Sequence, residues 1–116
     1  MSKGRVVVVD DNSGMRTLVA LHLDVDGWDV VGEAGDAEAG LALVRELLPD
    51  AVVLDQELPY GPGTRVLPMM REACPDARIV LFSADATHWE LGVSLGADAF
   101  LLKGDPLSVL TGLLTR

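Results

Sequence analysis

Two apolar stretches that end in acidic residues decide the predicted fold: Arg5-Val-Val-Val-Val-Asp-Asp11 and Ala51-Val-Val-Leu-Asp55. An unbroken run of Val and Leu is typical of a strand buried on both faces, as in a parallel sheet. Each run therefore predicts a buried strand with a carboxylate at its C-terminal end. If the two strands are neighbours, Asp10, Asp11 and Asp55 converge on one pocket. Such a cluster repels itself unless a cation compensates it, and its hard oxygen ligands suit Mg²⁺.

Further strand-like segments alternate with helix-like segments along the chain. We expect strands at 5–9, 29–33, 51–55, 78–83 and 99–102. Between and after them, apolar residues recur at helical spacing. This spacing predicts five helices, each following one strand, and so five βα units.

Capping residues and prolines set the expected helix boundaries. Ser13 and Asp36 are expected to cap the first two helices, which end at Gly27 and before Pro49. The third helix covers 66–73, with Pro68 delaying or bending its first turn, and the fourth covers 86–95, ended by Gly96. The last helix is expected to have Asp105 as its cap and Pro106 at its first position, and to run to Arg116.

This alternation predicts an α/β fold with one domain over residues 1–116. We expect a flavodoxin-like, doubly wound sheet of five parallel strands in the order 2-1-3-4-5, with helices on both faces. Strands 1 and 3 are then neighbours at the topological switch point, where open α/β sheets place their ligands. Ser83 and Lys103 end the fourth and fifth strands on the same rim.

Composition narrows the function classes. The chain has 116 residues, 49% of them hydrophobic and 4% aromatic, and a net charge of −9. This negative charge argues against nucleic-acid binding, which needs clustered Lys and Arg. The single cysteine, Cys74, is expected to pack at a helix end. No signal peptide or long apolar span is evident, so we expect a soluble cytoplasmic protein that does not bind membranes.

Each polar residue of the predicted pocket also has a structural explanation. An Asp after a strand is often a turn former or a helix cap. Considered by itself, Lys103 is explained as a solvated residue at a strand end, and Ser83 as a common loop residue. Asp55 is explained poorly by capping, because no helix follows it at once. Only the combination of three carboxylates with a countercharge favours a functional site.

The chain resembles a response-regulator receiver domain over essentially its whole length. The resemblance is carried by Asp10-Asp11 with Arg16, Asp55 with Pro59 and Gly63, Ser83-Ala84, and Phe100-Leu-Leu-Lys103. It implies that Asp55 accepts a phosphoryl group from a histidine kinase or phosphotransfer protein. It also implies that Asp10 and Asp11 hold Mg²⁺ together with Asp55, that Ser83 and Lys103 contact the phosphoryl oxygens, and that Phe100 is an aromatic switch.

Some positions depart from the family pattern. Gly104 follows Lys103 where the family usually has Pro, so the loop is expected to be looser. Glu57 lies at the position whose backbone carbonyl coordinates the metal in the family. Its carboxylate is a candidate metal ligand, and the alternatives are contact with a bound water, contact with Lys103, or simple solvation. Ser83 keeps the hydroxyl of the Thr that is also common there.

The two histidines, His22 and His88, are expected to be surface or packing residues without a catalytic partner. Trp89 is either part of a signalling face or a packing residue, and Trp28 is expected in a loop without an assigned role. The last helix is short and no output segment follows it in this sequence. We therefore expect output through a partner protein or a homodimer, on the face of the fourth helix, fifth strand and fifth helix, unless the chain is a fragment.

Three function classes remain open on the sequence alone. The first is a phosphorylation-controlled receiver, not an enzyme beyond phosphoryl uptake and slow hydrolysis. The second is a degenerate receiver that acts as a phosphorylation-independent interaction module. The third is a flavodoxin-type electron carrier. It is disfavoured because Asp10 and Asp11 would repel a flavin phosphate, and because the loop after the first strand lacks the composition of a phosphate loop.

Overall fold

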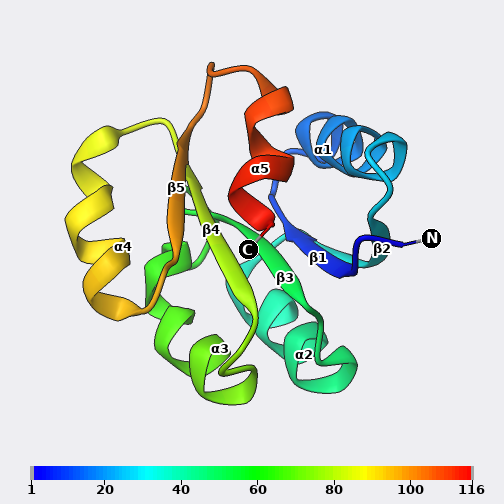
Figure 1. Cartoon of the computed structure of the whole chain (residues 1–116). Coiled ribbons are helices and arrows are strands. Elements are labelled where there is room, and N and C mark those ends of the chain that lie inside the picture. The colour runs from blue at the N-terminus through cyan, green and yellow to red at the C-terminus, as the bar shows by residue number, and fades with distance from the viewer. Residues whose placement is uncertain (1, 116) are drawn as a thin grey trace.

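The computed structural model describes residues 2–115 and contains a parallel five-stranded sheet (Figure 1). The strand order is β2-β1-β3-β4-β5, which confirms the predicted doubly wound topology. The strands are β1 (Arg5–Val9), β2 (Asp29–Ala34), β3 (Ala51–Asp55), β4 (Arg78–Ser83) and β5 (Ala99–Leu102). Only β2 differs from the expected range, by one additional residue.

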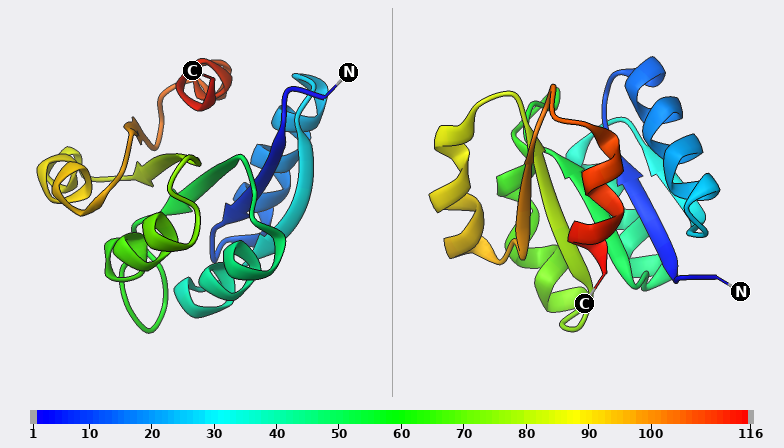
Figure 2. Two further views of the ribbon diagram at one scale, coloured as in Figure 1. Left: turned by 60° about the horizontal axis from the view of Figure 1, so that its bottom comes forward. Right: turned by 45° about the horizontal axis from the view of Figure 1, so that its top comes forward.

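Helices cover both faces of this sheet, as predicted. They are α1 (Ser13–Val25), α2 (Ala37–Leu47), α3 (Leu67–Ala73), α4 (Trp89–Leu95) and α5 (Leu110–Leu114). The left view of Figure 2 shows α5 on one side of the sheet and α2 and α3 on the other. Short 3₁₀ turns at 63–65, 86–88 and 107–109 precede the last three helices. Pro68 therefore lies in the first turn of α3, where its missing N–H leaves no helical hydrogen bond unmade.

One of the two predicted N-caps of the early helices is wrong. Asn12, not Ser13, caps α1, because its side-chain oxygen accepts a hydrogen bond from the Met15 N–H at 2.9 Å. Ser13 is already the first helical residue. At α2 the expected cap is confirmed: Asp36 Oδ1 accepts from the Ala39 N–H at 2.8 Å.

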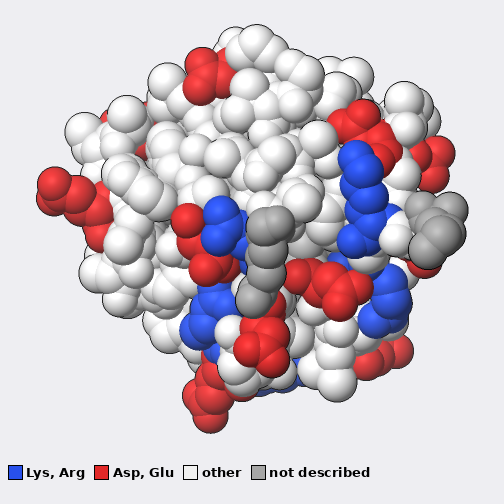
Figure 3. All heavy atoms as spheres, viewed as in Figure 1, with Lys and Arg blue, Asp and Glu red and all other residues white. Residues whose placement is uncertain are grey.

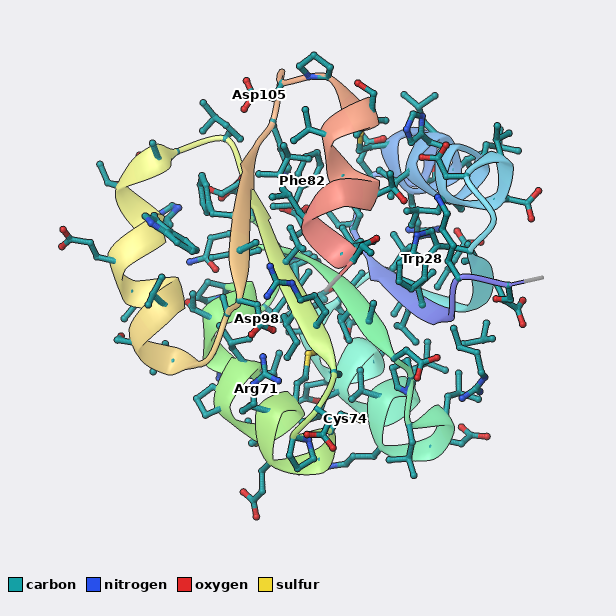
Figure 4. The ribbon with its side chains drawn as sticks, viewed as in Figure 1. Trp28, Arg71, Cys74, Phe82, Asp98 and Asp105 are labelled. Carbon is teal, nitrogen blue, oxygen red and sulfur yellow. The ribbon has the colours of Figure 1, made fainter. Side chains whose placement is uncertain are left out.

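The predicted start of the last helix is also wrong. Asp105, labelled in the loop after β5 in Figure 4, makes no capping hydrogen bond. Its backbone instead pairs with Lys103 in an isolated bridge. Pro106 precedes a 3₁₀ turn, and the α-helical part begins only at Leu110. Residues 107–109, which were expected to lie in the first α-helical turn, form a 3₁₀ turn instead. The expected end of this helix at Arg116 lies outside the described residues.

Two apolar layers hold the helices to the sheet. Alternate side chains of each strand point to opposite faces, so Val7 and Val9 pack toward α2 and α3 while Val6 and Val8 pack toward α1 and α5. The approach of α2 to β1 is close, because a Cβ on Gly40 would lie 2.7 Å from Val9 Cγ2. This packing fixes the end of β1, where Asp10 follows.

Trp28 and Cys74 are both buried (Figure 4). Cys74 lies at the C-terminal end of α3, as expected. Trp28 lies in the loop before β2, as expected; its indole N–H also donates to Thr111 Oγ1 at 2.9 Å, which ties this loop to α5. Among residues 2–115, no helix combines the length and apolarity that a membrane crossing requires.

Candidate functional site

Three carboxylates meet at the C-terminal ends of β1 and β3, an edge that the right view of Figure 2 turns toward the reader. The two strands are paired, with Val9 opposite Leu54. Asp10 and Asp11 follow β1, and Asp55 ends β3; each offers an oxygen, and these oxygens all lie within 4.8 Å of one another. Asp10 and Asp55 are buried while Asp11 is exposed. The predicted convergence of the three residues is therefore present in the structure.

Hydrogen bonding satisfies only half of each buried carboxylate. Asp10 Oδ1 accepts from the Asn12 N–H at 2.9 Å, and Asp55 Oδ1 accepts from the Glu57 N–H at 3.0 Å. The Oδ2 atoms of Asp10 and Asp55 are buried and have no hydrogen-bond partner among the described residues. Leaving such oxygens unpaired is costly. Their unmet capacity, beside the exposed Asp11 carboxylate, fits a hard divalent cation such as Mg²⁺.

Lys103 supplies the countercharge that the sequence predicted. Its Nζ lies 2.7 Å from Asp55 Oδ1, and its backbone N–H donates to the Ser83 carbonyl at 2.7 Å. Burial raises the pKa of Asp55 from an ordinary value of 3.8 to about 6, with Asp10 adding to the effect and Lys103 opposing it. Burial alone would lower the pKa of Lys103, but its contacts with Asp55 raise it. Lys103 thus stays charged. The residue after it, Gly104, has a positive φ of 102°.

Glu57 lies across the pocket from Asp55 and engages the rim formed by β4 and β5. Its Oε2 accepts from Ser83 Oγ at 2.6 Å, and its Oε1 accepts from the Ala84 N–H at 2.8 Å. Lys103 Nζ lies 3.4 Å from the same Oε1. Partial burial works against the charged form of Glu57, but these donors outweigh it and lower its pKa. Of the alternatives for this residue, the contact with Lys103 is confirmed; its role as a metal ligand stays a prediction.

The loop after β3 is fastened to the end of that strand. The buried Gln56 side chain donates to Thr64 Oγ1 at 3.0 Å and accepts from the Thr64 N–H at 2.9 Å. The Gly63 N–H donates to the Gln56 carbonyl at 3.0 Å, and a Cβ at Gly63 would overlap the backbone oxygen of Asp55. Only glycine fits this approach, which closes the loop beneath the carboxylate.

His88 contacts two residues of the pocket, which was not predicted from the sequence. Its Nδ1 lies 2.9 Å from Ser83 Oγ and 3.6 Å from Glu57 Oε2. Ser83 itself is fully buried. The sequence held no signal for this contact, because it depends on the path of the 3₁₀ turn 86–88 after β4. His22, by contrast, lies on α1 beside Asp26, at 3.3 Å.

Phe100 lies on β5 and faces α4 instead of the carboxylates. Its ring centroid is 5.7 Å from that of Trp89, with the planes inclined by 51°. The ring is half-buried and packs at the border of the core layer under α2 and α3. Figure 3 shows that the surface over α4, β5 and the upper part of α5 carries few charged side chains. An aromatic pair and a largely uncharged surface therefore occupy the face expected to signal.

A doubly wound α/β sheet with three carboxylates at its switch point and a lysine beside them defines a class of acidic, cation-compatible ligand sites. The family model described as "Response regulator receiver domain" matches residues 6–114. The chain therefore belongs to the receiver-domain family of two-component response regulators.

Relatives agree with this assignment. The chain is 39% identical over 83 residues to the protein-glutamate methylesterase/protein-glutamine glutaminase of Maricaulis maris, covering 71% of this chain and 21% of that protein. It is 34% identical over 104 residues to the nitrate/nitrite response regulator NarL of Escherichia coli K12, covering 84% and 47%. The chain thus spans half or less of the length of these curated relatives.

A solved structure matches over its full length. The signal receiver domain of the putative response regulator NarL from Mycobacterium tuberculosis is 34% identical, with a TM-score of 0.86 and 100% of both chains covered.

Proposed function

We propose that this chain is the phosphoryl-accepting switch of a two-component pathway and that Asp55 is the acceptor. The observation that carries the proposal is the state of the Asp55 carboxylate. It is fully buried, Lys103 contacts one of its oxygens, and the other oxygen has no partner among the described residues. A carboxylate oxygen that lacks a hydrogen-bond partner and lies in a pocket with a lysine side chain is a competent nucleophile.

In the proposed reaction, Asp55 Oδ2 attacks the phosphorus of a phosphohistidine on a histidine kinase or phosphotransfer protein. An O–P bond forms and the N–P bond breaks, with its electron pair returning to the imidazole nitrogen. Lys103 holds the acceptor in place and offsets negative charge on the incoming group. Ser83 Oγ and the Ala84 N–H are the donors that would serve the transferred oxygens; in this structure both donate to Glu57.

Asp10, Asp11 and Asp55 are the residues that would hold Mg²⁺. When bound, the cation supplies charge neutralisation for the phosphoryl oxygens. Asp10 is itself positioned by two contacts: its N–H donates to the Ala34 carbonyl at 2.9 Å, and its carbonyl accepts from Arg16 at 2.6 Å. We keep Glu57 as a candidate further ligand, although its carboxylate is engaged elsewhere in this structure.

The proposed output is a change of protein contacts on the face of α4, β5 and α5. The aromatic pair Trp89–Phe100 lies there, and Val109, at the end of the 3₁₀ turn just before α5, is an exposed apolar residue. The partner is a second copy of the chain or an output protein; the net charge of −9 argues against nucleic acid as the direct partner. The chain's own catalysis is limited to phosphoryl uptake and slow hydrolysis.

The test is phosphorylation by acetyl phosphate with Mg²⁺, followed by mass spectrometry of the intact protein and its peptides. We expect one added phosphoryl group, located on Asp55 and absent from Asp55→Asn. Asp24→Asn, an exposed carboxylate on α1, serves as the matched control and should be modified normally. Modification that persists in Asp55→Asn would contradict the assignment. No modification of the wild-type chain or of any variant would favour the phosphorylation-independent module.

A further inference from the structure

Three hydrogen-bond donors converge on one anion at the rim of the pocket, and that anion is Glu57. The donors are Ser83 Oγ, the Ala84 N–H and Lys103 Nζ, at 2.6, 2.8 and 3.4 Å from the carboxylate oxygens. Two of them are bound by one oxygen and the third by the other. A carboxylate held by several donors in this way is strongly favoured in its charged form.

The same three groups are those that the proposed function assigns to the transferred phosphoryl oxygens. Lys103 Nζ makes the overlap direct, because it lies between Asp55 Oδ1 at 2.7 Å and Glu57 Oε1 at 3.4 Å. A phosphoryl group on Asp55 would bring its oxygens to donors already occupied by Glu57. Two anions cannot share these donors without strong repulsion.

We propose that Glu57 is a built-in competitor that occupies the phosphoryl-oxygen site of the unmodified chain and is displaced when Asp55 is phosphorylated. This inference rests on the proposed function and adds the regulation of its site. The Glu57 side chain has a path out, because 39% of its surface is exposed, whereas Asp55 is fully buried. Occupancy by Glu57 lowers the affinity of the site for a phosphoryl group and favours the unmodified state.

Displacement of Glu57 also changes the surroundings of His88. His88 Nδ1 contacts both Ser83 Oγ at 2.9 Å and Glu57 Oε2 at 3.6 Å, and it directly precedes Trp89, the first residue of α4. When Glu57 leaves, Ser83 turns to the phosphoryl oxygens and His88 loses one partner. The replacement of the Glu57 carboxylate by the phosphoryl group therefore affects the start of α4 through the His88 side chain.

The test measures the affinity of the whole chain for beryllofluoride, a phosphoryl mimic, in the presence of Mg²⁺. Glu57→Ala is expected to bind it about tenfold more tightly than the wild type, since hydrogen bonds to the charged carboxylate no longer compete. Glu57→Asp tests whether the effect comes from occupation of the Ser83 and Ala84 donors or from the negative charge of the side chain. It keeps the negative charge, but its shorter side chain cannot reach Ser83 and Ala84, so it should also bind more tightly. Glu90→Gln, an exposed acid on α4, should match the wild type.

The backbone amide of Ala84 gives a second readout that needs no phosphorylation. In the wild-type chain its proton resonance should lie downfield because it donates to a carboxylate. Glu57→Ala should shift it upfield, and beryllofluoride should restore the downfield position. If Glu57→Ala and Glu57→Asp bind beryllofluoride like the wild type, the inference is overturned while the proposed function stands. If neither the wild type nor any variant binds beryllofluoride or takes up phosphate from acetyl phosphate, the proposed function fails and the inference with it.

Discussion

The Lys103 ammonium lies 2.7 Å from Asp55 Oδ1, and this ion pair joins the end of β5 to the end of β3 across β4. The pair does not fully compensate the carboxylate. Burial, assisted by Asp10, still raises the pKa of Asp55 to about 6. The site is therefore built at a cost to the cation-free fold, and this cost can be measured.

The first prediction concerns pH and stability without metal. The pKa of Asp55 is higher in the folded chain, about 6, than its ordinary value of 3.8. Its stabilising contribution is therefore complete below about pH 3.8 and is lost as the pH rises through about 6, by about 3 kcal/mol. Urea unfolding of the wild type and of Asp55→Asn in EDTA, between pH 4 and 7, should show a stability difference that moves in favour of Asp55→Asn. Equal pH slopes for the two proteins would contradict the shift.

The second prediction separates stability from metal binding at Asp11. This carboxylate is exposed and adds like charge beside Asp10 and Asp55. We expect Asp11→Ala to be as stable as the wild type or more stable in EDTA, and to bind Mg²⁺ at least tenfold more weakly. Calorimetric titration with Mg²⁺ and thermal unfolding in EDTA provide the two measurements. Asp24→Ala is the control, and unchanged Mg²⁺ affinity in Asp11→Ala would remove this residue from the metal site.

The third prediction concerns the close approach of Gly63 to the backbone of Asp55. A methyl group at position 63 would overlap the Asp55 carbonyl, so Gly63→Ala should lower the free energy of unfolding by about 2 kcal/mol. It should also slow phosphorylation by acetyl phosphate, because the displaced carbonyl belongs to the acceptor residue. Gly112→Ala is the matched control, since a Cβ there meets nothing within 4 Å. An unfolding free energy of Gly63→Ala equal to that of the wild type would show that the loop yields without cost.

The fourth prediction concerns the aromatic pair on the proposed output face. The sequence contains two tryptophans, so Trp28→Phe leaves Trp89 as the sole indole. In this background, beryllofluoride with Mg²⁺ should change the Trp89 emission, because the ring packs on Phe100. Sedimentation under the same conditions tests self-association. Adding Phe100→Ala should abolish the response of Trp89; a response that survives unchanged would exclude Phe100 as the switch.

The sequence by itself determined the framework of this protein. The uninterrupted runs 5–9 and 51–55 indicated buried strands, and their alternation with amphipathic helices indicated a parallel sheet, for which the flavodoxin-like order is β2-β1-β3-β4-β5. Parallel strands end at the same edge of a sheet, so the strand order alone places the residues that follow or end these strands on one rim. These residues are Asp10, Asp11, Asp55, Ser83 and Lys103. These conclusions depend on strand order alone.

Only the tertiary structure decided the contacts made by residues in loops. Glu57 contacts Ser83, Ala84 and Lys103, and His88 contacts Ser83, because the paths of the loops after β3 and β4 bring these residues together. Loop paths and side-chain rotamers depend on contacts between segments far apart in the sequence, which periodicity does not encode. For the same reason the caps at Ser13 and Asp105 were predicted wrongly, since neighbouring backbone and tertiary packing outweighed local preference.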